Sequence, residues 1–152
     1  MSILDGLRRR ELIEAVEADP ATATQWLEDA GRHLEAAIKI ADLDPSGSYV
    51  PAYDAARKSV ADAVLMAGYR VLSRPGSHQA LAQYADSLAA QTGEHALKRF
   101  DRLRRNRNRS EYGSRTFGKA EVPGAIDTAQ AIRAACANIA GRHHRAWSTR
   151  AG

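Results

Sequence analysis

The sequence predicts an all-α protein built as an up-and-down bundle of about five helices. Apolar residues recur at three- and four-residue steps, and no segment alternates convincingly in the manner of a strand. Proline, glycine or a capping residue stands at each break in the pattern. Aromatic residues make up only 6% of a chain that is 44% hydrophobic, so small and aliphatic side chains should fill the core. At 152 residues, one domain is expected.

A short first helix is predicted over 3–18 and should end at the Asp-Pro pair of 19–20. Thr22 and Gln25 have the spacing of a capping box, in which the two side chains satisfy backbone N–H groups at a helix start. The apolar stripe that follows runs to Ala41. A long second helix is therefore expected.

The segment 44–48, with the sequence Asp-Pro-Ser-Gly-Ser, is predicted to be a turn. The next helix should begin near Pro51, whose fixed φ suits a first turn, and should end before Gly68. A further break at 73–76 precedes a fourth helix, for which Ser77 is the expected N-cap.

Two more helices complete the predicted bundle. In the first, Leu97, Phe100 and Leu103 point one way, and the next position on this apolar stripe is Arg107. A polar loop then leads to a long last helix over 126–147. The predicted organisation is an N-terminal helical extension over 1–20, the bundle over 21–147 and a frayed tail over 148–152.

Positive charge is concentrated in the segment 98–109. It holds seven basic residues against the single acid Asp101, a net charge of +6, whereas the whole chain carries +4. Such a concentration attracts a polyanion such as RNA, DNA or a phosphate-rich ligand. The alternative is a solvated arginine-rich helix face.

The remaining composition argues against several classes of protein. The single cysteine, Cys136, excludes an intrachain disulfide framework and a cysteine-based zinc site. No histidine has a partner at metal-ligand spacing, so neither a metal nor a cofactor is expected, and structural or surface roles are favoured for His33, His78 and His95. The chain shows no apolar run long enough to cross a bilayer and no apolar core of a secretory signal. A cytoplasmic protein without membrane contact is expected.

Three features, in this order along the chain, resemble the HEPN domain family of small helical proteins. They are the small-residue helix 53–58, the exit 68–71 with Gly-Ser-His at 76–78, and the segment 105–113. The resemblance covers about residues 22–139. It implies a HEPN-like bundle.

The functional signature of that family is an arginine, usually followed by a polar residue, and then a histidine after four to six intervening positions. Here Arg107 with Asn108 reaches Tyr112 across four residues, and Arg105 with Asn106 reaches it across six. The motif thus ends in tyrosine in place of histidine. Family members that cleave RNA are similar to metal-independent endoribonucleases in which two protomers share one cleft.

The resemblance implies catalytic roles for Arg107, Asn108 and Tyr112. A phenol has an ordinary pKa of ~10 against ~6.5 for imidazole, so Tyr112 is a poor general base and cleavage should be weakened or lost. The residues expected to bind nucleic acid are Arg102, Arg104, Arg105, Arg107 and Arg109.

Two functional classes stay open. The first is an RNA- or nucleotide-binding HEPN-like homodimer, as a ribonuclease or toxin-like component of a two-gene defence module whose partner would be an antitoxin. The second is a noncatalytic dimeric partner or regulatory subunit, for example of a nucleotidyltransferase. Cleavage of RNA without added metal would separate the two.

Overall fold

The structure, a computed structural model, describes residues 2–111 and 120–151, with side chains described over 2–109 and 120–142. It is mostly helical, with one small two-stranded sheet. The predicted all-α bundle is confirmed. None of the described helices combines the length and apolar character needed to cross a bilayer.

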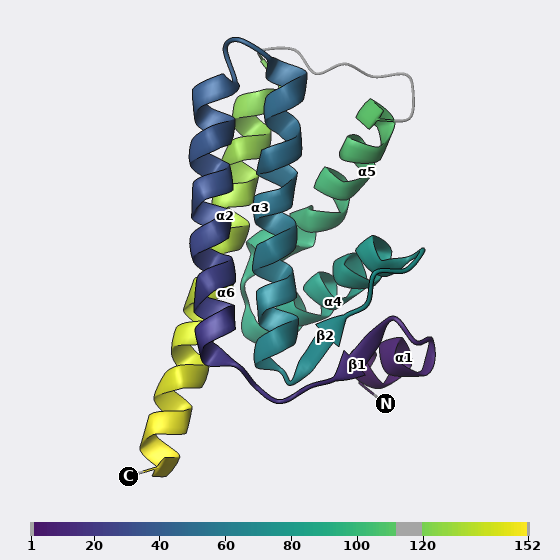
Figure 1. Cartoon of the computed structure of the whole chain (residues 1–152), viewed down its shortest axis with the longest axis vertical. Helices are drawn as coiled ribbons and strands as arrows, with labels where there is room; N and C mark the ends of the chain where they lie inside the picture. The colour runs from purple at the N-terminus through teal and green to yellow at the C-terminus, as the bar shows by residue number, and fades with distance from the viewer. Residues whose placement is uncertain (1, 112–119, 152) are drawn as a thin grey trace.

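Three long helices run side by side and form the body of the molecule (Figure 1). The central one, α3, contacts both of the others along its length. The C-terminal part of α6 extends beyond the N-terminal end of α2 (Figure 1). The three helices are α2 (Pro20–Ile40), α3 (Pro45–Met66) and α6 (Val122–Ala151).

The shorter elements lie together on another side of the molecule, where β2, α4 and α5 contact α3 directly (Figure 1). They bring the N-terminal segment, the turn after α3 and the basic segment onto one side of the molecule. These elements are α1 (Ile3–Arg9), β1 (Ile13–Ala15), β2 (Tyr69–Val71), α4 (Ser77–Thr92), the 3-10 helix η1 (His95–Arg99) and α5 (Phe100–Glu111).

The N-terminal extension differs from the helix predicted over 3–18. Helix α1 ends at Arg9, and Glu11 takes a left-handed backbone conformation with φ of 56°, which a helix cannot accommodate. Strand β1 then pairs antiparallel with β2, with Ile13 opposite Val71. The expectation of no strand was therefore wrong, because two strands of three residues each are too short to show alternation.

Two predicted helix starts were also wrong. Asp19 caps α2 by accepting a hydrogen bond from the Thr22 N–H at 3.0 Å, so Thr22 does not cap the helix. Helix α3 begins at Pro45, inside the predicted turn, because Asp44 accepts from the Gly47 N–H at 2.9 Å. In both cases an aspartate precedes a proline, and proline suits the first helical position.

The start of α4 needs a smaller correction. Gly76, with φ of 90°, is the N-cap, and Ser77 is the first helical residue. The Ser77 hydroxyl instead closes the preceding turn, because it accepts a hydrogen bond from the Arg74 N–H at 3.0 Å and donates to the Arg74 carbonyl at 2.7 Å. This bonding fixes the backbone that carries Arg74.

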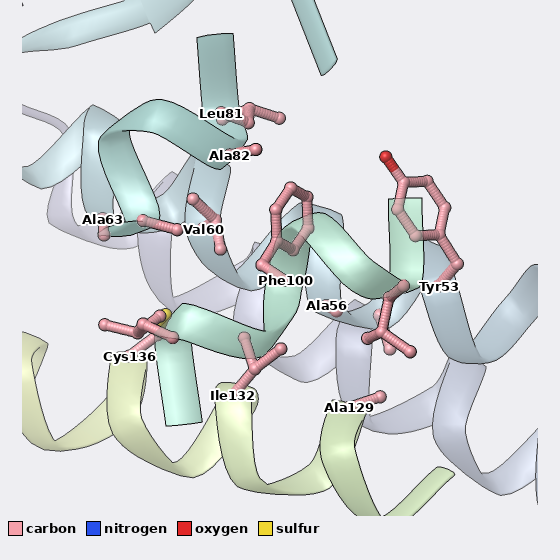
Figure 2. Packing of buried hydrophobic residues seen from close by; sticks show 14 of the residues in the cluster. Tyr53, Ala56, Val60, Ala63, Leu81, Ala82, Phe100, Ala129, Ile132 and Cys136 are labelled. Atoms are coloured by element: carbon pink, nitrogen blue, oxygen red, sulfur yellow. The ribbon is translucent and has the colours of Figure 1, made fainter. Parts of the chain in front are cut away.

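The core is centred on α3, whose small residues let other elements approach closely. Ala56 and Val60 are fully buried, and Phe100, at the start of α5, is also fully buried beside them (Figure 2). Leu97 and Leu103 are buried with Phe100, which confirms the predicted apolar stripe of the basic segment. Because this stripe enters the core, α5 is held against α3 and its remaining faces are fixed in direction.

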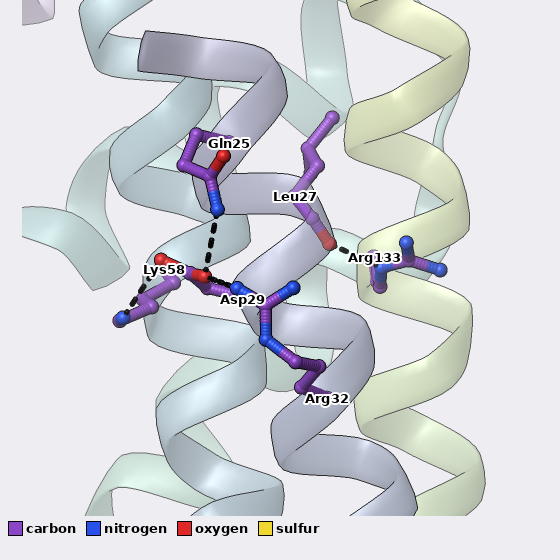
Figure 3. Close-up of polar contacts among 6 residues, drawn as sticks. All are labelled: Gln25, Leu27, Asp29, Arg32, Lys58 and Arg133. Carbon is purple, nitrogen blue, oxygen red and sulfur yellow. Dashed lines mark hydrogen bonds and ion pairs between the residues drawn. The ribbon is translucent and has the colours of Figure 1, made fainter.

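Polar contacts join α2 to its two long neighbours (Figure 3). Asp29 on α2 binds Lys58 of α3 at 3.5 Å and also pairs with Arg32 one turn further along α2. On the other side, Arg133 of α6 donates from Nε to the Leu27 carbonyl at 2.8 Å. These contacts help to hold the three long helices in register.

Candidate functional site

Helix α5 presents its arginines in two directions. Arg102, Arg105 and Arg109 are exposed, whereas Arg104 and Arg107 are half-buried toward α3. This division follows from the apolar stripe, because positions on the buried face of the helix alternate with solvent-facing positions at helical spacing. The sequence-predicted nucleic-acid residues thus form an exposed set and an inner set.

Asp101 is the only acid in the segment 98–109, and it binds two of the arginines. Its carboxylate lies 2.7 Å from Arg104 and 3.1 Å from Arg105. Within the described part of the chain, no carboxylate pairs with Arg102 or Arg109. The exposed face of α5 therefore carries charge that the described residues do not neutralise.

A pocket of about 370 Å³ adjoins this exposed face, between α5 and the start of α6. Arg99, Arg102 and Asn106 line it from one side, and Thr128 lines it from the other. Glu121 is the one acidic residue among its described lining residues. The pocket offers guanidinium, amide and hydroxyl groups, which bind phosphate and nucleobase edges.

On the inner side of α5, Arg107 lies over the ring of Tyr53. The guanidinium carbon is 5.3 Å from the ring centroid, within the range of a cation–π interaction. Tyr53 is fully buried in α3 and also stacks on Phe100, with ring centroids 5.8 Å apart. Arg107 is therefore positioned by an aromatic surface.

The Tyr53 hydroxyl joins this group to α4, because it lies 2.6 Å from Nδ1 of His78. Burial raises the pKa of Tyr53 to about 12, although nearby arginines oppose the shift, so the phenol keeps its proton at neutral pH. Because a phenol O–H is a stronger donor than a neutral imidazole N–H, we assign Tyr53 as the donor and Nδ1 as the acceptor. His78 then carries its own proton on Nε2.

His78 is held in its neutral form. Burial lowers its pKa, and the positive charges of Arg57 and Arg107 lower it further, whereas Asp54 opposes them. A neutral imidazole with its proton on Nε2 is a hydrogen-bond donor on that side. It is not a ready acceptor for a substrate proton.

The structure brings some of the predicted site residues together. Arg104 and Arg107 lie on the inner side of α5, and Asn108 is half-buried on the same helix. Tyr112, which ends the predicted motif, lies outside the described residues. Asp54 and Arg57 form an ion pair within α3, with 3.6 Å between the paired atoms.

Sequence reasoning missed the contact between Tyr53, His78 and Arg107. A structural or surface role for His78 was favoured, and its bond to a buried tyrosine is a structural role. The signal available was weak: Tyr53 and His78 both belong to the segments that resemble the HEPN family, but 25 positions separate them. Nothing in their spacing indicates that they meet.

Comparisons of the chain with protein families, curated proteins and solved structures found no match. No group of three or more metal-ligating side chains is present in the part of the chain that the structure describes. The site is therefore characterised by its own residues, an exposed arginine face joined through Arg107 to the buried Tyr53, which contacts the exposed His78.

Proposed function

We propose that this protein is a HEPN-like RNA-binding protein that contacts phosphates through the exposed face of α5. The observation that carries the proposal is the set of exposed arginines on α5, where the single acid of the segment 98–109, Asp101, binds Arg104 and Arg105. Guanidinium groups bind phosphate through paired hydrogen bonds. The adjoining pocket of about 370 Å³ supplies Asn106 and Thr128 for contacts with sugar or base.

Weak or absent cleavage belongs to the same proposal. Metal-independent cleavage needs a group that takes the proton of the RNA 2′-hydroxyl. His78 is linked to Arg107 through Tyr53. In the assigned tautomer its Nδ1 accepts from Tyr53 and its Nε2 carries a proton. It would serve as a donor to phosphate. The homodimer implied by the family resemblance stays a prediction.

The test measures how RNA binding depends on salt. We expect fluorescence anisotropy with a labelled single-stranded RNA to give an affinity that falls steeply as salt rises, because each phosphate contact releases a counterion. Arg102→Gln combined with Arg109→Gln should lower the slope of log affinity against log salt by about 1.4 units, two contacts at about 0.7 each.

The matched control is Arg8→Gln combined with Arg9→Gln. Both arginines are exposed on α1, and replacing them removes the same charge from the molecule as the α5 variant does. They should leave the slope nearly unchanged. Equal losses in both double variants would show that net charge and not α5 governs binding, and no RNA binding by the wild type would favour the noncatalytic partner.

A further inference from the structure

A second basic pocket lies between α2, α3 and the turn that leads into α4. It has a volume of about 400 Å³, within the usual range for small-molecule sites. None of the described residues that line it is acidic. The residues that matter for binding come from five separate segments: Trp26, Arg57, Arg70, Arg74 and His78.

The three arginines are held in place while most of their donors stay available. Arg70 pairs across the sheet with Glu14, and Arg74 binds the side chain of Glu11 at 3.3 Å. Each of these contacts engages one terminal nitrogen of a group that has five N–H donors. Exposed ion pairs of this kind contribute only about 0 to 1 kcal/mol, so an entering anion can share or replace them.

Their side chains reach solvent to different extents. Arg70 and Arg74 are 58% and 51% exposed, whereas Arg57 is 31% exposed and lies deeper in the pocket. The bond between Ser77 and the Arg74 backbone fixes the turn that carries Arg74. A ligand would therefore meet one arginine at the pocket floor and two at its rim.

Trp26 gives the pocket a planar apolar wall. It is half-buried on α2, so part of the indole faces the pocket while the rest packs against the protein. An indole beside guanidinium groups suits a ligand that combines a flat ring with an anion, since bases stack on aromatic side chains.

The charges around His78 give this part of the pocket a net positive field. Arg57, Arg107 and Arg104 all disfavour a charge on its imidazole, and only Asp54 opposes them. With Tyr53 as the donor to Nδ1, the remaining ring nitrogen is a neutral donor. A phosphate group would gain a hydrogen bond there and would share Arg57 with the Asp54 carboxylate, which lies 3.6 Å from it.

We propose that this pocket binds a nucleoside monophosphate, with Arg57, Arg70 and Arg74 on the phosphate and the base against Trp26. The shared chemistry is a phosphate monoester on a nucleoside, either a free nucleotide or the 5′ end of an RNA strand. The pocket is separate from the exposed face of α5, so binding here does not depend on the proposed RNA contacts.

Tryptophan fluorescence tests this inference in the full chain. A Trp147→Phe background leaves Trp26 as the single tryptophan. Adenosine 5′-monophosphate should change its emission saturably, whereas adenosine alone and inorganic phosphate alone should each bind at least about tenfold more weakly. No saturable change up to about 5 mM nucleotide would overturn the inference.

Variants locate the binding within the chain. Arg70→Gln combined with Arg74→Gln should weaken nucleotide affinity at least about tenfold, with helix content checked by circular dichroism. Trp26→Leu, measured by calorimetry, should also weaken it. Unchanged affinity in the folded arginine variant would overturn the inference. The α1 variant, Arg8→Gln with Arg9→Gln, is the matched control and should bind as the parent does.

Two further arms separate the ligand sources and the two proposals. If a 5′-phosphorylated tetranucleotide binds at least as tightly as the mononucleotide and its 5′-hydroxyl counterpart does not, the pocket takes a strand end. Binding of the mononucleotide alone supports a free nucleotide. Arg102→Gln with Arg109→Gln should weaken the α5 contribution to RNA binding and leave the mononucleotide titration unchanged, so each proposal can fail without the other.

Discussion

Asp62 carries a carboxyl group that is buried in the core and takes no part in either proposed site. Its side chain belongs to α3, the residue is 1% exposed, and neither carboxyl oxygen has a hydrogen-bond partner among the described residues. Burial disfavours the charged form and raises the pKa of Asp62 to about 7, from an ordinary value of 3.8. The folded protein therefore keeps a proton that the unfolded chain releases.

The direction of the pH effect follows from these two pKa values. As the pH rises from about 4 to about 7, the unfolded chain loses the proton first, so the contribution of Asp62 to the free energy of unfolding falls. Asp62→Asn removes this loss. We therefore expect the free energy of unfolding of the variant minus that of the wild type to be about 2 to 4 kcal/mol larger at about pH 8 than at about pH 4. Chemical denaturation at both pH values measures this difference.

Asp42→Asn is the control, because Asp42 is exposed in the turn after α2. Its effect on the free energy of unfolding should differ little between the two pH values. If Asp62→Asn shows the same small pH dependence as the control, then the carboxyl of Asp62 is not held in its neutral form by the fold.

At the level of single residues, the sequence predicted which side chains share a face of one helix, because helical spacing alone determines that. Leu97, Phe100 and Leu103 share a face and are buried, as expected. The contact of Tyr53 with His78 could not be predicted, because two residues on different helices meet only through packing. The same holds for the cation–π contact of Arg107.

The start of α3 illustrates how one element is stabilised. Asp44 accepts the Gly47 N–H, Pro45 takes the first helical position, and the Asp44 carboxylate fills the space that a side chain at Gly47 would need. The cap thus depends on an aspartate, a proline and a glycine in fixed order. These residues were interpreted as a turn because all three are also common in turns.

We expect Asp44→Ala to lower the free energy of unfolding by about 1 kcal/mol, because an N–H at the start of α3 loses its acceptor. Urea denaturation measures the change. Asp42→Ala, two residues earlier and outside the helix, should change stability by less than about 0.5 kcal/mol. Equal effects of the two substitutions would contradict a capping role for Asp44.

The short elements were the hardest to predict. Strands β1 and β2 pair residues that are distant in the sequence, such as Glu14 with Arg70, 56 positions apart, and neither strand is long enough to display a period of two. Their effect on the pocket is nevertheless large, because β2 carries Arg70 and the following turn carries Arg74. The sequence indicated a helical protein and the location of its charge, but not the pocket that the two-stranded sheet helps to form.

Across the whole molecule, the basic groups form two sites that meet at His78. Arg107 approaches from α5 through Tyr53, and Arg57 approaches from the second pocket. Both arginines oppose a charge on the His78 imidazole. An anion bound beside either arginine would therefore favour protonation of His78.

The most direct test of the proposed function is an NMR titration that follows the arginine side-chain Nε–H signals as single-stranded RNA is added. We expect the signals of Arg102, Arg105 and Arg109 to shift saturably, because these exposed guanidinium groups contact phosphate. The signals of Arg8 and Arg9 should stay near their starting positions. Unshifted α5 signals at saturating RNA, or equal shifts on α1 and α5, would contradict the proposal that α5 is the RNA-binding face.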